Sequence, residues 1–571
     1  MRKLLSITLL TTALVVPAHA QDIAQIAKSD PLIISGAIGT NNTYHHSSQG
    51  SGYASPLSNT VYANLDISIY GMSMPFSLYY SNNNTSFSYP HISFNISPKY
   101  KNWQAHFGQS SMAFSSYVMN TSFNGVGLEY NDGMFRGGAF YGTLRSAVND
   151  DPNDPYARTP QYKRIGWGLK VGYGSVSNYV DLYVLKASDR LNSLDERWQQ
   201  LVSPQNNFVV GLKGAVTPVN FLSFNANVAT SAFSVDTRGR SVETDDAKKW
   251  SSIFDTKYTS LMRFAGDVSA NVNIGAWTTS LFYRMVQPNY TSLGTSYMSN
   301  NYQGFGLNVS GSLFSRLSLS AMYSLQQDNL TKKQLYTTSG SVYNLNLGTS
   351  IGQNFNINAS YNGYLQSQGD GTAKVTDSTR VKRIMNSFSL TPSYSINGAA
   401  LTHYISASIN YTNNKDLSPL ATGKDDVNTF AAGVTYDMNV PSWKTNFTTS
   451  FNHQTSKSYE QTYTTDILSL SAHRSFLKEN NLTLSGTINL VYNKLKKMRE
   501  NMSLGGNLSC AYTIKKVHAF SLTAGINKMS DVNVSVDEQP YNSTEINASF
   551  NYTYTFTLFQ IKNKNNKDNE L

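Results

Sequence analysis

Histidine and serine stand side by side at one place in the chain, where His45 and His46 precede Ser47 and Ser48. A Ser–His hydrolase needs a base that folding places beside the nucleophile, and an acid that orients the base. Adjacency in sequence provides neither, and the pattern described below assigns this stretch to an exposed loop. We therefore predict a polar loop here and no enzyme active site.

Three carboxylates gather in the segment Asn-Asp-Asp-Pro-Asn-Asp-Pro, at Asp150, Asp151 and Asp154. Calcium prefers oxygen ligands, so these side chains and nearby carbonyls make a candidate Ca²⁺ site. Their spacing is not that of an EF-hand loop, and a solvated acidic loop is the favoured interpretation. No zinc or haem spacing is present, and the single cysteine, Cys510, excludes a disulfide within the chain. We expect no other cofactor.

Eight further titratable side chains fall in stretches where apolar and polar residues alternate. Alternation places them on the strand face opposite their apolar neighbours. They are Asp66, His106, Lys170, Asp181, Lys213, Asp267, Arg284 and His473.

The elements that carry these residues alternate with period two. From Ile165 to Gly174, five large apolar residues alternate with glycine and one lysine, and the same pattern recurs from Leu482 and from Ile546. Such stretches predict β-strands with one apolar face. The second face is mostly Gly, Ser, Thr and Asn, whereas the outer face of a soluble sandwich is rich in Lys and Glu. This favours a transmembrane β-barrel, with lipid outside and water inside.

Composition supports that interpretation. Charged residues are 14% of the 571 residues and aromatic residues are 12%, so the chain is too poor in charge and too rich in aromatics to be disordered. The mean hydropathy is -0.34, and no apolar run beyond the N-terminus reaches the length of a membrane helix. We therefore expect strands, and not helices, to cross the membrane.

The breaks between strands alternate between long and short. Long ones include 236–261 and 287–301, and short ones include 131–133 and 275–276. This parity is typical of outer-membrane barrels, which have short periplasmic turns and long extracellular loops. We predict a closed antiparallel all-β barrel of about 26 strands (range 22–26).

The predicted organisation has four parts. Residues 1–20 form a signal peptide with Arg2 and Lys3, an apolar stretch and an Ala18-His19-Ala20 cleavage site. A short periplasmic segment (21–31), the barrel (32–559) and a polar periplasmic tail (560–571) follow. The formal net charge is +10, or +8 without Arg2 and Lys3. Because the chain is predicted to be exported and lacks a basic helix face, outer-membrane lipid is the expected partner and nucleic acid is not.

The Tyr-, Asn- and Ser-rich alternating sequence resembles that of large outer-membrane barrels of Bacteroidota, and two stretches carry the resemblance best. These are Ser97-Pro98-Lys99-Tyr100-Lys101-Asn102-Trp103 and Gly125-Val126-Gly127-Leu128-Glu129-Tyr130. The chain is similar to uncharacterised barrel proteins of that group and, more distantly, to the barrel of their gliding and secretion translocon. The resemblance implies an outer-membrane location and does not indicate a cargo.

A barrel of about 26 strands would enclose a wide lumen that must be blocked. The sequence predicts no plug domain, so long loops folded inward or a partner protein must fill it. Two hypotheses follow: a transport channel or conduit, and a non-conducting scaffold that anchors partners. A barrel-embedded hydrolase ranks third. The eight titratable residues would line the lumen, either as a selectivity lining or as pairs across the barrel. Since both signs occur, no strong anion or cation preference is expected.

Overall fold

The computed structural model describes residues 30–50, 56–70, 72–82, 92–150, 158–245, 249, 251–459, 461–477, 479–496, 498–534 and 539–561. The predicted signal peptide and most of the predicted tail lie outside these residues, so both stay predictions.

The described chain is almost entirely β-strand, with single-turn helices only in connections. The helices are η1 (Leu191–Ser193), α3 (Glu196–Gln199) and η2 (Pro441–Trp443). The strands are β1 (Leu32–Ser47), β2 (Leu57–Ile69), β3 (Met72–Ser81), β4 (Ile92–Ile96), β5 (Lys99–Tyr100), β6 (Trp103–Ser110), β7 (Phe123–Asn131), β8 (Phe135–Arg145), β9 (Arg164–Gly174), β10 (Tyr179–Asp189), β11 (Asn206–Val219), β12 (Leu222–Ser234), β13 (Ser260–Ile274), β14 (Trp277–Val286), β15 (Tyr302–Leu313), β16 (Leu317–Asp328), β17 (Tyr336–Ile351), β18 (Phe355–Asp370), β19 (Lys382–Asn397), β20 (Thr402–Asp416), β21 (Val427–Val440), β22 (Thr445–Lys457), β23 (Thr462–Phe476), β24 (Leu482–Leu495), β25 (Arg499–Ile514), β26 (His518–Val534) and β27 (Asn542–Ile561).

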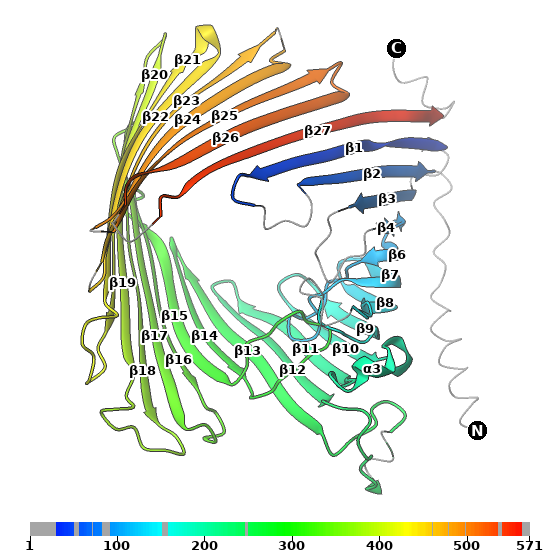
Figure 1. Ribbon diagram of the computed structural model, residues 1–571. Coiled ribbons are helices and arrows are strands. Elements are labelled where there is room, and N and C mark those ends of the chain that lie inside the picture. The colour runs from blue at the N-terminus through cyan, green and yellow to red at the C-terminus, as the bar shows by residue number, and fades with distance from the viewer. Residues whose placement is uncertain are drawn as a thin grey trace.

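These strands form one sheet that closes on itself. Neighbours in sequence pair antiparallel, and β1 pairs with both β2 and β27, so the first and last strands lie side by side (Figure 1). The segments β4 and β5 share one position, because both pair with β3 on one side and with β6 on the other. Counting them as one strand gives 26 strands, which confirms the predicted closed antiparallel barrel.

Proline explains the break between β4 and β5. Pro98 has no N–H to donate to a ladder, and it falls between the two segments. Its carbonyl still accepts from the Ala105 amide at 2.8 Å. The wall therefore stays continuous at a point where one strand cannot pair along its full length.

Long loops and short turns alternate around most of the barrel. The turn between β13 and β14 contains only residues 275–276, whereas β12 and β13 are separated by residues 235–259. Gly275 has a φ of 57°, a left-handed conformation that glycine adopts readily. Towards the C-terminus the alternation fades, since only residues 458–461 separate β22 from β23. We call the two ends of the barrel the long-loop rim and the short-turn rim.

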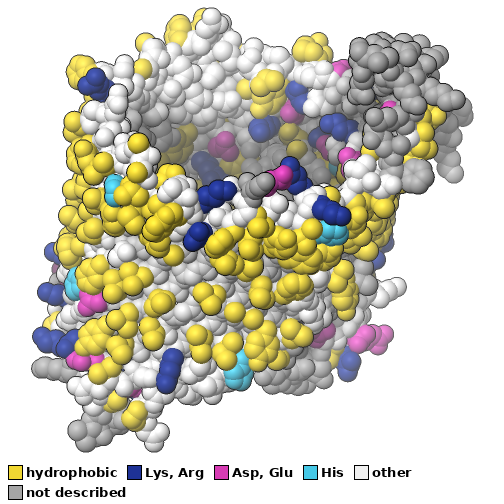
Figure 2. Space-filling model, turned by 90° about the horizontal axis from the view of Figure 1, so that it is seen from above, with side chains coloured by type: hydrophobic (Ala, Val, Ile, Leu, Met, Phe, Trp, Pro, Cys, Tyr) yellow, Lys and Arg dark blue, Asp and Glu magenta, His cyan; other side chains and the backbone are white. Residues whose placement is uncertain are grey.

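The outer and inner faces differ as expected for a membrane barrel. On β9 the side chains of Leu169 and Val171 are 41% and 42% exposed, although both are apolar, and Gly168 and Gly172 on the other face are buried. Apolar side chains cover the outer wall in Figure 2, and the hollow at its upper end shows mostly uncharged surface with a few charged groups. A closed sheet with an apolar outer face can span lipid with all backbone groups paired. Among the described residues, no helix is long and apolar enough to cross a membrane.

One expectation about the first strand was wrong. The sequence pattern put His45 and His46 in an exposed loop, but both belong to β1, which continues to Ser47. The register explains the extension, because His45 and His46 lie opposite Asn547 and Ile546 of β27. The long β27 supplies backbone partners that a local pattern cannot reveal.

Candidate functional site: the inner loop pair

The hydrophobic core of this protein lies inside the barrel. Two long-loop connections, residues 111–122 between β6 and β7 and residues 287–301 between β14 and β15, fold against the inner wall; we call them the inner loop pair (Figure 1). Their buried side chains pack on inner-face residues of β8–β14. The core members are Met112, Tyr117, Val118, Met119, Phe123, Phe140, Tyr183, Leu185, Val209, Ala229, Ala265, Val286 and Tyr290.

The two loops are joined to each other by backbone and side-chain hydrogen bonds. The Tyr290 hydroxyl donates to the Tyr117 carbonyl at 2.8 Å, and Ser292 Oγ donates to the Val118 carbonyl. The amide of Asn120 donates to the Gly294 carbonyl at 3.0 Å. Burial raises the pKa of the Tyr290 phenol, so it remains a neutral donor. The loops therefore form one unit, although about 170 residues separate them.

Tyr117 ties this unit to the charged wall. Its hydroxyl donates to Asp267 Oδ1 at 2.7 Å and accepts from Arg284 Nε at 3.0 Å. Burial, and then the hydrogen bond to Asp267, raises the pKa of the Tyr117 phenol well above its usual value. Two of the eight sequence-predicted residues, Asp267 and Arg284, are thus brought together by a tyrosine that the sequence analysis did not single out.

A second anchor holds loop 287–301 to β11 and β12. The Asn207 side chain is fully buried; its Oδ1 accepts from the Leu293 amide at 2.9 Å and its Nδ2 donates to Ser231 Oγ at 2.7 Å. Ser231 Oγ in turn donates to the Thr291 carbonyl. Buried backbone groups of the loop are therefore satisfied by wall side chains, as a loop inside a barrel requires.

Glycines on the inner wall make room for the loops. A Cβ at Gly211 would lie 2.5 Å from Val118 Cγ2, and one at Gly138 would lie 2.9 Å from Met112 Cε. On β9, a Cβ at Gly168 would lie 2.9 Å from the Phe114 ring. These three inner-face glycines, which appear in the sequence as the small side of alternating strands, are sites of close packing.

His106 and Lys170 meet at a carboxylate on β7. Glu129 accepts from His106 Nε2 at 2.8 Å and from Lys170 Nζ. Lys170 Nζ also donates to the Ala113 carbonyl at 3.3 Å, which links this cluster to loop 111–122. Glu129 stands in one of the stretches that carried the resemblance, but only the fold shows that it joins the two predicted residues.

Register places five charged side chains in one row of the inner wall. Across β8–β14, residues directly opposite one another run in the order Arg136, Gly172, Asp181, Lys213, Asn227, Asp267 and Arg284. Asp181 reaches over Gly172 to form an ion pair with Arg136 at 2.8 Å. A Cβ at Gly172 would collide with Asp181 Oδ1, so glycine is required for this pair.

The other predicted lumen residues lie apart from these clusters. Lys213, opposite Asp181, has no ion pair or hydrogen bond within the described residues. Asp66 on β2 accepts from Ser73 Oγ at 2.9 Å. His473 on β23 lies opposite Asn446 and Ser485, two small polar residues. Whether any of the eight selects ions stays a prediction.

One chain of side-chain contacts resembles a hydrolytic triad, and it joins Ser97, His106 and Glu129. His106 Nδ1 lies 3.5 Å from Ser97 Oγ, and Nε2 contacts Glu129. Ser97 is only 7% exposed, and its hydroxyl donates to Asn95 Oδ1 at 2.8 Å. The serine is therefore packed into the wall instead of being presented to a substrate.

The calcium candidate is only partly described. Asp150 accepts from Arg158 Nε at 2.8 Å and from Nη2 at 3.1 Å, and this ion pair lowers the pKa of the Asp150 carboxyl. Asp151 and Asp154 lie outside the described residues. Among the residues that are described, no three His, Cys, Asp or Glu side chains are grouped as metal ligands.

Sequence reasoning also missed a buried ion cluster at the long-loop rim. Asp189, whose side chain is fully buried, pairs with Arg164 at 2.8 Å and with Arg145 at 3.4 Å. It also accepts from the Gln205 amide at 3.1 Å. These residues are far apart in sequence and meet only because β8, β9 and β10 are neighbours.

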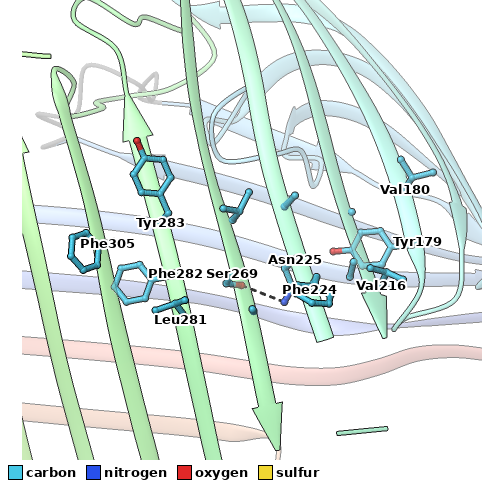
Figure 3. A pocket seen from close by; sticks show the side chains of 15 residues that line it. Tyr179, Val180, Val216, Phe224, Asn225, Ser269, Leu281, Phe282, Tyr283 and Phe305 are labelled. Carbon is cyan, nitrogen blue, oxygen red and sulfur yellow. Dashed lines mark hydrogen bonds between the residues drawn. The ribbon is translucent and has the colours of Figure 1, made fainter. Parts of the chain in front are cut away.

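An apolar groove of about 650 Å³ lies on the barrel wall between β10 and β15 (Figure 3). Its lining includes small residues of the outer rows, such as Gly214, Ala226 and Ala270, and larger apolar ones, such as Val216, Leu281 and Phe305. Since the exposed apolar side chains mark this face as the lipid-facing one, the groove is part of the membrane belt and not of the lumen.

No family model matches the chain, and no curated protein sequence matches it. Several solved structures do. The translocation pore of the P pilus usher PapC is 10% identical over 92% of this chain and 100% of its own, with a TM-score of 0.36. OccAB2 of Acinetobacter baumannii is 11% identical over 68% of this chain and 97% of its own (TM-score 0.28), and OprD of Pseudomonas aeruginosa is 10% identical over 72% and 97% (TM-score 0.30). At these values the likeness concerns the barrel architecture alone.

Proposed function

We propose that the protein is an outer-membrane transport channel whose lumen is narrowed by its own inner loop pair. The observation that carries this proposal is the burial of loop residues against the inner wall, where Val118 and Tyr290 are 0% and 1% exposed. A barrel this wide needs an obstruction, and the inner loop pair provides one without a separate plug domain.

The position of the loops argues for a channel rather than a filled barrel. The core packs on β8–β14, whereas the inner face of β24–β27 carries mainly Asn, Ser, Thr and Gly. A wall that only had to support a filled interior would carry apolar residues all round. The polar side therefore supports a water-filled path beside the loops.

Conductance of the purified barrel in planar bilayers tests this function. We expect the parent protein to give small steps, and a variant with residues 112–121 replaced by a short Gly-Ser linker to give larger ones. Replacement of residues 374–379, in the β18–β19 loop on the same rim, is the matched control and should leave the steps unchanged. Circular dichroism and heat-modifiable gel mobility verify that each variant is a folded barrel.

The alternative is a scaffold that anchors partners and conducts nothing. It predicts silence from the parent barrel and from both loop variants. It also predicts that a protein co-purifies after mild detergent extraction. Folded barrels that remain silent when residues 112–121 are replaced would refute the channel proposal. The proposal includes a relationship to Bacteroidota barrels, export by a signal peptide and a periplasmic position of the short-turn rim.

A further inference from the structure

Asparagine and glycine form a checkerboard on the inner face of the last four strands. Asn489 of β24 lies opposite Gly505 of β25, which lies opposite Asn527 of β26, and Glu545 of β27 ends this row opposite Asn527. In the adjacent row, Asn507 lies opposite Gly525, which lies opposite Asn547 of β27. The flanking residues confirm the orientation, because Leu504, Leu508 and Ile526 on the other face are more than half exposed to the membrane side.

The checkerboard is recessed. Two adjoining cavities of about 470 and 340 Å³ open on it and share Asn507, Gly525 and Asn547. A Cβ at Gly525 would find its nearest neighbours at 3.5 Å or more, and one at Gly505 would lie 3.3 Å from Asn527 Oδ1. The glycines therefore leave space above the backbone, with amide side chains standing around it.

Several of these amides have unused hydrogen-bonding capacity. Within the described part of the chain, the side chains of Asn489 and Asn507 have no hydrogen-bond partner. Asn527 Oδ1 accepts from Ser503 Oγ, and Asn547 Oδ1 contacts His45 Nδ1. These contacts use the amide oxygens and not the amide nitrogens. Each free amide can donate and accept side by side.

Charge distinguishes this region from the opposite wall. None of the residues lining the two cavities is Asp, Glu, Lys or Arg, and His45 is the one titratable imidazole among them. An anionic solute entering here would lose hydration without gaining a counter-charge, and Glu545, opposite Asn527 at the edge of the face, would repel it. An apolar solute would leave the amides unsatisfied.

We propose that this Asn–Gly face of β24–β27 binds a neutral polyhydroxylated solute, an oligosaccharide, as it passes the inner loop pair. Neighbouring sugar hydroxyls both donate and accept, so one asparagine amide can bind two of them. Three strand spacings of about 4.8 Å make the face about 14 Å wide, which suits a chain of sugar units better than a single one. This inference rests on the proposed channel function and names its substrate class.

A peptide is the competing ligand, because its backbone also pairs with amides. Peptide side chains differ in charge and polarity, however, and a wall of repeated asparagines offers nothing to distinguish or bury them. The repeated surface matches a repeated ligand. Peptide binding is therefore an outcome that would count against the proposal.

Titration calorimetry of the full barrel in a sugar-free detergent tests the site. The ligands are maltoheptaose and isomaltoheptaose, with a galacturonic acid heptamer and a Gly-Ser heptapeptide as comparisons. We expect saturable binding of a neutral sugar, about five- to tenfold weaker in Asn507→Ala and weaker in Gly525→Ala, whose methyl fills the recess. Gly506→Ala is the matched control. Gly506 follows Gly505 in β25 and belongs to the lipid-facing side, and a Cβ there would have open space around it. This variant should bind the sugar as the parent does.

The outcomes separate the site from the channel. Binding of neither neutral sugar, equal binding of the peptide or the acidic heptamer, or unchanged affinity in folded Asn507→Ala would overturn the site. If bilayer conductance is present while sugar binding is absent, the channel stands and the inference fails. If sugar binds to a barrel that conducts nothing even without residues 112–121, the site stands and the channel proposal fails.

Discussion

The Tyr117 hydroxyl should control how firmly the inner loop pair is attached to the barrel wall. Tyr117→Phe keeps the aromatic ring, which packs edge-on against the Tyr290 ring with 6.5 Å between the ring centroids. It removes the hydrogen bonds to Asp267 and Arg284. A hydrogen bond to a charged group contributes about 1.5–3 kcal/mol. We count only the bond to Asp267, because Arg284 is exposed and water can replace its bond to the hydroxyl, and we take the lower part of that range, about 1.5–2 kcal/mol. At 1.4 kcal/mol for each factor of ten, the detached state of the loop should become roughly 10- to 30-fold more populated.

Single-channel recording measures this change directly. We expect the parent barrel to visit a larger conductance level rarely, and Tyr117→Phe to visit it about 10- to 30-fold more often. Tyr297→Phe is the control, since Tyr297 lies in the loop 287–301 and is 80% exposed. Asp267→Asn should raise the frequency as well, and the double variant should add little to either single change, because the residues share one bond.

Two results would contradict this role of the Tyr117 hydroxyl. If Tyr117→Phe gates like the parent while its fold is intact, the hydroxyl does not hold the loop. If the effects of Tyr117→Phe and Asp267→Asn are fully additive, each acts through some other contact. In both cases the inner loop pair would be held by its apolar packing alone.

Three other predictions test the barrel, the rim and the loops. Ile488→Arg places a charge on the lipid-facing side of β24, where Ile488 is 57% exposed. It should lower the free energy of unfolding by about 2–4 kcal/mol in a urea titration in lipid vesicles. Asn489→Arg on the inner face should lower it far less, and equal losses would contradict the assignment of the two faces. Asp189→Asn leaves Arg164 and Arg145 without their shared carboxylate and should cost about 3–5 kcal/mol in the same titration, while Asp195→Asn at an exposed ion pair should be nearly neutral. The Arg238 guanidinium lowers the pKa of Asp236 to about 2. A lowered carboxyl pKa stabilises the folded state fully above the pKa of the unfolded chain, about 4, and this stabilisation is lost as the pH falls through the folded pKa of about 2. A carboxyl ¹³C titration with a midpoint near 4 would show that the ion pair does not form.

Most charged residues of the row on the inner wall have a structural role, which does not depend on ion selection. Arg136 pairs with Asp181, and Asp267 and Arg284 both bind Tyr117. Most of these charges therefore hold the wall and the loops together. This agrees with the alternative that wet charges pair within the barrel, and it leaves Lys213 as the member of the row available to a passing solute.

The inner loop pair shows where local reasoning stops. Residues 112–119 include Met112, Phe114, Tyr117, Val118 and Met119, which is an apolar composition for a segment between two strands. That composition was the available signal that this connection is buried. Its partner, loop 287–301, lies about 170 residues away, and no spacing in the sequence joins the two.

The sequence by itself determined the class of fold, the closed barrel and its approximate strand number, because period-two alternation and turn chemistry are local properties of the chain. It also placed Lys170 and Asp267 on the strand face opposite their apolar neighbours. Only the tertiary structure decided what fills the lumen, which charges meet, and which glycines are packed against side chains. Those features depend on contacts between strands and loops that lie far apart in the sequence, and local patterns do not encode them.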